Sequence, residues 1–185
     1  MFNLSTQDVV LSIKNTPLVN LDGILYQEYH NFFDNDRIET LEKNVDNLRY
    51  QKLEKQFDMN RKIVDYNEDL MKKVKIFFMH SSITNELEKK FETDLNFESV
   101  DIWLDGPGYY LPPHTDDTRI KLALQIYLGN DNVGTSLYDQ NKRAIKTFSF
   151  KVNSGYALLN NKNSLHGLTS PVTKASRISL YARYN

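Results

Sequence analysis

The spacing of hydrophobic positions differs between the two halves of the chain. Over residues 1–95, apolar residues recur mostly at steps of three and four, which is the period of an amphipathic helix. From Ser99 onward, short runs rich in β-branched and aromatic residues alternate with polar positions, as in strands. The pattern predicts a mainly helical first half and a β-rich second half that offers the helices an apolar surface to cover.

The first half is expected to contain a short strand at residues 17–21 and four helices. The first helix begins at Ile24, and the second follows a turn or N-cap at residues 34–36. The fourth begins at Ser82, because acidic residues fall in the turns that follow it. Residues 49–66 are ambiguous. The apolar positions that carry the helices are Ile24, Leu25, Tyr29, Phe32 and Phe33; Ile38, Leu41, Val45 and Leu48; Leu70, Val74, Phe77 and Phe78; and Ile83, Leu87 and Phe91.

Strands are predicted at residues 99–104, 121–128, 147–150, 155–159 and 177–184, and such short strands at short intervals indicate a sandwich or barrel. Two of them have one apolar and one partly polar face, since neighbouring residues of a strand point to opposite sides. The apolar face is expected to pack on the helices and the polar face to line a cavity. The polar faces carry Lys121, Ala123, Gln125 and Tyr127 in one strand and Arg177, Ser179, Tyr181 and Arg183 in the other.

Composition narrows the class of protein. The 185 residues are 40% hydrophobic and 25% charged, an ordinary composition for one globular domain. The net charge of −1 gives no general electrostatic case for a nucleic acid partner. The absence of cysteine excludes disulfides, thiolate metal sites and a cysteine nucleophile. The N-terminus makes a poor signal peptide, and no stretch approaches about 18 apolar residues, so we expect the cytoplasm as the simplest location and no membrane partner.

His114 and Asp116 lie two residues apart in the sequence His114-Thr115-Asp116. On an extended chain these side chains project to the same side. His166 follows about fifty residues later, just after the predicted strand at residues 155–159. Two histidines and one carboxylate form the facial set of non-heme iron(II) oxygenases, which leaves coordination positions open. Taken alone, the His-x-Asp pair is equally compatible with a polar surface turn.

Arg177 and Ser179 strengthen the metal-site interpretation. They open the last predicted strand, shortly after His166, and share one face of it. A guanidinium binds a carboxylate through two hydrogen bonds, and a hydroxyl can add a third. The pair would therefore suit the distal carboxylate of 2-oxoglutarate.

The order H-x-D, distal His and R-x-S resembles the 2-oxoglutarate/Fe(II)-dependent oxygenase superfamily, in particular its prolyl-hydroxylase-like branch. The resemblance covers residues 17–184, and its specific part lies between residues 103 and 182. It implies an α+β fold, a double-stranded β-helix (a jelly-roll or cupin-like barrel) buttressed by N-terminal helices. We therefore expect a single oxygenase domain over residues 1–185, with helical support over about 1–95 and the jelly-roll core over about 97–185.

The resemblance also implies roles for single residues. His114, Asp116 and His166 match the iron ligands and thus the catalytic centre. Arg177 matches the basic residue that binds the 5-carboxylate of 2-oxoglutarate, and Ser179 matches the hydroxyl of its R-x-S motif. Tyr127 falls where the prolyl-hydroxylase branch has a tyrosine that hydrogen-bonds the same carboxylate. The implied cofactors are Fe(II), 2-oxoglutarate as cosubstrate and O2.

Two positions depart from the prolyl-hydroxylase branch. That branch usually has a tyrosine about nine residues before the H-x-D motif, where this chain has Asp105. It often has Gly-Gly-Glu-Thr after the third strand, where this chain reads Val-Gly-Thr-Ser at residues 133–136. These departures place the peptidyl-proline substrate in question, not the iron site. Because halogenating relatives lack the carboxylate ligand, Asp116 favours hydroxylation or a related oxidation.

The predicted function is the hydroxylation of an unactivated C–H bond with release of succinate and CO2. A protein side chain such as proline is the first substrate hypothesis, and a small metabolite is the alternative. A jelly-roll module that binds a ligand without turnover is the alternative of another class. Among the remaining residues, His30 and His80 are interpreted as structural or surface residues, and Asp117 and Arg119 as part of a mobile loop over the site. Gln125 is interpreted as a neighbour of the cosubstrate and Arg183 as a substrate contact.

Overall fold

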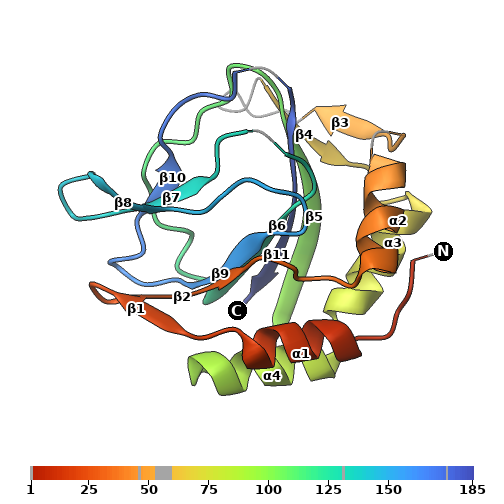
Figure 1. The fold of residues 1–185 in the computed structure, drawn as a ribbon, viewed down its shortest axis with the longest axis horizontal. Helices are drawn as coiled ribbons and strands as arrows, with labels where there is room; N and C mark the ends of the chain where they lie inside the picture. The colour runs from red at the N-terminus through yellow and green to blue at the C-terminus, as the bar shows by residue number, and fades with distance from the viewer. Residues whose placement is uncertain (1, 46, 53–59, 131, 174) are drawn as a thin grey trace.

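The computed structural model describes residues 2–45, 47–52, 60–130, 132–173 and 175–185, which form four helices and eleven strands (Figure 1). The helices are α1 (Gln7–Asn15), α2 (Asn35–Val45), α3 (Asp69–Phe78) and α4 (Ser81–Phe91). The strands are β1 (Val19–Leu21), β2 (Ile24–Tyr29), β3 (Tyr50–Lys52), β4 (Arg61–Val64), β5 (Phe97–Asp105), β6 (Leu122–Tyr127), β7 (Thr135–Tyr138), β8 (Ala144–Thr147), β9 (Gly155–Leu159), β10 (His166–Leu168) and β11 (Arg177–Tyr184).

The strands form two antiparallel sheets. The large sheet has the order β1-β2-β9-β6-β11-β5-β4-β3, and the small sheet has the order β10-β7-β8. The small sheet lies across from β6, β9 and β11, whereas the helices lie beyond the other side of the large sheet (Figure 1). This arrangement is a double-stranded β-helix buttressed by helices, which confirms the predicted fold class.

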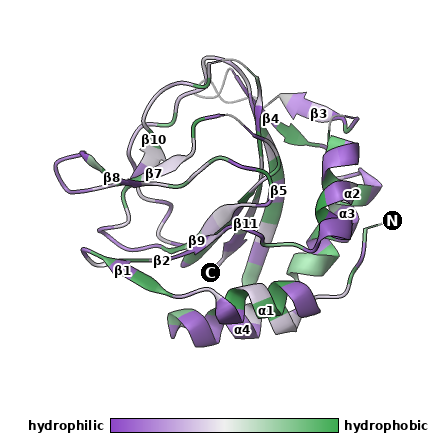
Figure 2. Cartoon of the chain, in the orientation of Figure 1, coloured by the Kyte–Doolittle hydropathy of each residue, from purple (hydrophilic) through white to green (hydrophobic). Residues whose placement is uncertain are grey.

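The main hydrophobic core lies between the helices and the large sheet. Leu122, Leu124 and Ile126 of β6 join this core together with buried residues of the helices. Leu180 and Ala182 of β11 join it as well, so the predicted apolar faces of both strands are confirmed. α2 and α4 carry hydrophilic stretches beside their hydrophobic ones, as expected for helices with one buried face (Figure 2). The opposite faces of β6 and β11 are thereby directed into the barrel.

The expected helix from Ile24 is wrong, because Ile24–Tyr29 is strand β2. The preceding Asp22 and Gly23 both have positive φ, 52° and 82°, and they join β1 to β2 with Leu21 opposite Ile24. A two-residue Asp-Gly loop is the preferred connection of a tight hairpin. This local signal outweighs the apolar spacing, which fits a short strand as well as a helix.

The remaining elements agree with the pattern in part. α2, α3 and α4 confirm three predicted helices, and Asp34 accepts a hydrogen bond from the backbone N–H of Arg37 at 2.7 Å, as a helix cap does. The strand predicted at residues 147–150 is displaced, since β8 ends at Thr147. The ambiguous segment contains β3 and β4, and its residues 53–59 lie outside the described part of the chain. No described helix has the length and apolarity needed to cross a membrane.

Candidate metal site and the adjoining cavity

His114 and His166 lie opposite each other in an isolated antiparallel bridge. Their backbones exchange two hydrogen bonds, from His114 N to His166 O at 3.0 Å and from His166 N to His114 O at 2.8 Å. Oδ1 of Asp116 lies 3.9 Å from Nε2 of His114 and 3.7 Å from Nε2 of His166. The ligand atoms of the three residues all lie within 4.8 Å of one another. The structure thus brings the predicted ligands together around a space that fits one metal ion.

Both imidazole rings are held by backbone carbonyls. Nδ1 of His114 lies 3.0 Å from the carbonyl oxygen of Pro112, and Nδ1 of His166 lies 3.0 Å from that of Ser164. Because a carbonyl only accepts, each Nδ1 carries a proton, and in the neutral tautomer that this bond selects the lone pair for a metal lies on Nε2. Burial lowers the pKa of His166, which favours the neutral, coordinating form.

Asp116 is oriented by a side chain and by its own loop. The hydroxyl of Tyr181 donates to Oδ2 at 2.9 Å, and burial raises the pKa of this tyrosine, so that it keeps its proton. The side-chain amide of Asn160 donates to the carbonyl oxygens of Asp116, Asp117 and Ile120 at 3.3, 3.1 and 2.8 Å. The loop that follows Asp116 is therefore tied to the end of β9.

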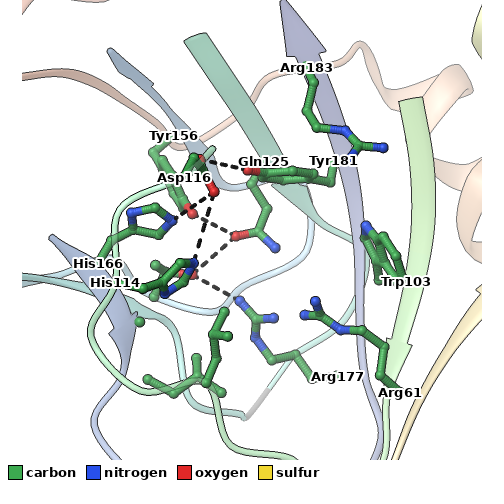
Figure 3. Close-up of a pocket in the computed structure, with 14 residues that line it drawn as sticks. Arg61, Trp103, His114, Asp116, Gln125, Tyr156, His166, Arg177, Tyr181 and Arg183 are labelled. Atoms are coloured by element: carbon green, nitrogen blue, oxygen red, sulfur yellow. Dashed lines mark hydrogen bonds and ion pairs between the residues drawn. The ribbon is translucent and has the colours of Figure 1, made fainter. Parts of the chain in front are cut away.

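A cavity of about 190 Å³ adjoins the three candidate ligands. The candidate ligands lie on one side of this cavity, and Trp103, Arg61 and Arg183 lie on the opposite side (Figure 3). Gln125, Thr135, Tyr156 and Arg177 also line it. The polar faces predicted for β6 and β11 thus supply Gln125, Arg177, Tyr181 and Arg183 to one cavity.

Arg177 is a buried cation at this cavity. Its guanidinium donates to the carbonyl oxygen of Val133 at 3.0 Å, to Oδ2 of Asp105 at 2.8 Å and to Oγ1 of Thr135 at 3.0 Å. It also stacks on Tyr127, with Cζ 5.3 Å from the ring centroid. Since a guanidinium has five N–H donors, three bonds to the described residues leave two donors for a ligand carboxylate.

Ser179 and Tyr127 are not among the residues that line the cavity. The hydroxyl of Ser179 accepts from the amide of Gln125 at 2.9 Å, and the hydroxyl of Tyr127 accepts from the backbone N–H of Thr135 at 3.0 Å. The carbonyl oxygen of the Gln125 side chain in turn accepts from Thr135 at 3.1 Å and from Tyr156 at 2.8 Å. In this structure both predicted residues support the residues that line the cavity.

Several lining residues had no assigned role in the sequence interpretation. Tyr181 could have been selected, because it lies on the predicted polar face between Arg177 and Arg183. Thr135 and Arg61 carried no comparable signal, since Thr135 lies on a strand that was not predicted and Arg61 in the ambiguous segment. The loop residues Asp117 and Arg119 form an exposed ion pair at 2.9 Å.

Solved structures of 2-oxoglutarate/Fe(II) oxygenases share this fold. The chain is similar to an oxidoreductase of the 2OG-Fe(II) oxygenase family from Burkholderia pseudomallei, at 11% identity and a TM-score of 0.65, with 100% of this chain and 92% of that chain covered. It is similar to a collagen prolyl hydroxylase of Paramecium bursaria Chlorella virus-1 in complex with 2OG, at 18% identity and a TM-score of 0.56, over 86% and 94% of the two chains.

HygX from Streptomyces hygroscopicus, solved with nickel, 2-oxoglutarate and hygromycin B bound, is similar at 7% identity and a TM-score of 0.63, over 98% of this chain and 87% of that chain. Neither a protein-family model nor a curated protein matches the sequence. At these identities the likeness concerns the fold alone.

Proposed function

We propose that this chain is an Fe(II)- and 2-oxoglutarate-dependent dioxygenase that hydroxylates an unactivated C–H bond, with release of succinate and CO2. The observation that carries the proposal is the convergence of the three candidate ligands and buried Arg177 on one cavity. A binding module that holds a ligand without turnover has no need for an open metal site and a carboxylate-binding cation together. The fold shared with oxygenases supports the same conclusion.

The residues at one end of the cavity would bind the metal, and those at the other end would bind the distal carboxylate of 2-oxoglutarate. His114, Asp116 and His166 would hold Fe(II), which supplies the redox chemistry with 2-oxoglutarate and O2 when these are bound. Arg177 would bind the 5-carboxylate through its two remaining N–H groups. Tyr127 and Ser179, assigned to the same carboxylate by resemblance, would act through Thr135 and Gln125, which they hydrogen-bond. The chain thus supplies geometry, charge and exclusion of water.

The cavity volume bears on the substrate. Small-molecule sites typically enclose about 300–1,000 Å³, whereas this cavity encloses about 190 Å³. It offers room for the cosubstrate and for little more, so the reacting group of the substrate would enter from outside. A side chain presented by a protein would enter in this way, with proline as the first hypothesis, and one similar structure is a collagen prolyl hydroxylase. A small metabolite is the second candidate, because HygX was solved with hygromycin B.

The decisive experiment starts with protein purified without oxygen. Addition of Fe(II) and 2-oxoglutarate should give the weak visible absorption band of 2-oxoglutarate chelated to protein-bound Fe(II). Succinate should then form when air is admitted. The His166→Ala variant should lose the band, whereas Arg177→Ala should raise the 2-oxoglutarate requirement far more than the iron requirement. A native protein without a chelate band would rule out the proposed function. Equal effects of Arg177→Ala on both requirements would assign this residue a structural role.

The substrate is then sought by comparing succinate release in the presence of two kinds of probe. Proline-containing peptides represent the first hypothesis, and free amino acids and sugars represent the second. The substrate class is identified by the probe that increases succinate release and itself gains the mass of one oxygen atom. A chelate band without succinate under any condition would favour the non-catalytic jelly-roll module.

A further inference from the structure

Arg61, Asp105 and Arg177 form a row across three neighbouring strands. Arg61 of β4 lies in register with Asp105 of β5, and Asp105 lies in register with Arg177 of β11. Residues in register on adjacent strands project to the same face of a sheet. The row therefore places two cations and one carboxylate side by side, and both arginines line the cavity (Figure 3).

Asp105 is shared between the two arginines. This fully buried carboxylate accepts at Oδ1 from Nε of Arg61 at 2.6 Å and at Oδ2 from Nη2 of Arg61 at 3.2 Å. Oδ2 also accepts from Nη1 of Arg177 at 2.8 Å. Within this row one negative charge faces two positive charges. Removal of Arg61 would leave Arg177 as the partner of Asp105 in the row.

Aromatic rings hold Arg61 at the cavity wall. Its Cζ lies 4.8 Å from the ring centroid of Trp103 and 4.3 Å from that of Tyr109. Cation–π contacts of this kind fix the position of a guanidinium without consuming its charge. Only 16% of the side chain is exposed, so its charge is poorly screened by solvent.

We propose that Arg61 is a second cationic determinant of cosubstrate binding. Arg177 would contact the distal carboxylate, while Arg61 would take up part of the charge of Asp105, so that the row keeps a positive field toward the cavity. This inference rests on the proposed function, because it concerns the 2-oxoglutarate site. It also gives Asp105, which departs from the tyrosine of the prolyl-hydroxylase branch, a defined place in that site.

The first test compares two substitutions that differ in charge. Protein loaded with Mn(II) is titrated with 2-oxoglutarate in a calorimeter, and the dissociation constants of Mn(II) and of 2-oxoglutarate are measured separately. Arg61→Gln should weaken 2-oxoglutarate binding about tenfold to a hundredfold, whereas Arg61→Lys should weaken it clearly less, because the positive charge remains although the two-bond contact with Asp105 is lost. Mn(II) binding should be unchanged in both. Arg143→Gln is the matched control, since Arg143 is exposed and pairs with Asp139 in the loop after β7.

The second test is a charge rescue. The double variant Arg61→Gln, Asp105→Asn has the same net charge in the row as the native protein, so its 2-oxoglutarate affinity should exceed that of Arg61→Gln. If Arg61 served only to hold the strands together, the second change would weaken binding further. Three results would each overturn the inference. The first is native-like 2-oxoglutarate affinity of Arg61→Gln, and the second is an equal loss of that affinity in Arg61→Gln and Arg61→Lys. The third is a folded double variant whose 2-oxoglutarate affinity does not exceed that of Arg61→Gln. Thermal melting establishes whether each variant is folded. If the double variant is unfolded, the comparison of Arg61→Gln with Arg61→Lys decides the inference.

The outcomes also separate this inference from the proposed function. Native protein that binds Mn(II) without binding 2-oxoglutarate would contradict the proposed function itself. Native protein that binds both, together with an Arg61→Gln variant that binds both equally well, would contradict only the role of Arg61.

Discussion

The hydroxyl of Tyr181 donates a 2.9 Å hydrogen bond to Oδ2 of Asp116, while Oδ1 of the same carboxylate faces the two imidazoles. The bond fixes the rotation of the carboxylate and leaves one defined oxygen for a metal. Tyr181 lies on the cavity face of β11, so the strand that carries Arg177, the proposed cosubstrate contact, also orients a candidate metal ligand. Partners of metal ligands commonly control metal affinity in this way.

Tyr181→Phe should therefore weaken metal binding about tenfold. The substitution removes only the hydroxyl, so the packing of the ring is kept. The measurement is the dissociation constant of Mn(II) for the metal-free protein. Tyr184→Phe is the control, since Tyr184 lies on the opposite face of the same strand, in the core. Unchanged Mn(II) affinity in Tyr181→Phe would show that the bond does not position Asp116.

Asn160→Ala should loosen the loop that follows Asp116. The amide of Asn160 donates to three carbonyl oxygens within residues 116–120, and alanine provides no donor. We expect the free energy of unfolding to fall by about 1–3 kcal/mol, with faster amide hydrogen exchange in the loop. Asn141→Ala, at an exposed turn position, serves as the control. Unaltered exchange in residues 116–120 would mean that other contacts hold the loop.

The parts of the fold that follow a regular period were predictable from the sequence. Leu124 and Leu180 fall on apolar faces that the alternation in β6 and β11 identifies, because strand geometry places every second side chain on the same side. The same geometry put Gln125 and Arg177 on the cavity face. His114 and Asp116 were recognisable because their spacing is local, two residues on an extended chain.

The parts that depend on long-range pairing were not predictable in the same way. The row of Arg61, Asp105 and Arg177 arises from the register of three strands, and no local pattern states which residues will face each other. In the sequence, Asp105 stood out only because the prolyl-hydroxylase branch usually has a tyrosine at this position. The hairpin at Asp22 and Gly23 is different, because the Asp-Gly pair is a local signal that the helical interpretation of the flanking residues overrode.

Gly167→Ala should disturb the candidate metal site through the backbone. A Cβ at this position would lie 2.7 Å from the carbonyl oxygen of Leu111 and 2.8 Å from that of Pro112, closer than such contacts allow. The segment that carries His114 would have to move away from His166, and we expect both stability and Mn(II) affinity to fall. Gly129→Ala is the control, since its Cβ would meet only the ring of Phe150 at an ordinary 3.5 Å. Native Mn(II) affinity in a folded Gly167→Ala protein would contradict this reasoning.

Leu180→Ala tests whether the two faces of β11 act independently. Leu180 is fully buried between the large sheet and the helices, whereas its neighbours Ser179 and Tyr181 project into the barrel. Removal of a buried leucine side chain should lower the free energy of unfolding by about 2–5 kcal/mol, which urea denaturation measures. At a temperature where the variant is folded, its Mn(II) affinity should equal that of the native protein, because the lost contacts lie on the helical side. A parallel fall in metal affinity would show that the packing of the helices determines the position of Tyr181, and with it the orientation of Asp116.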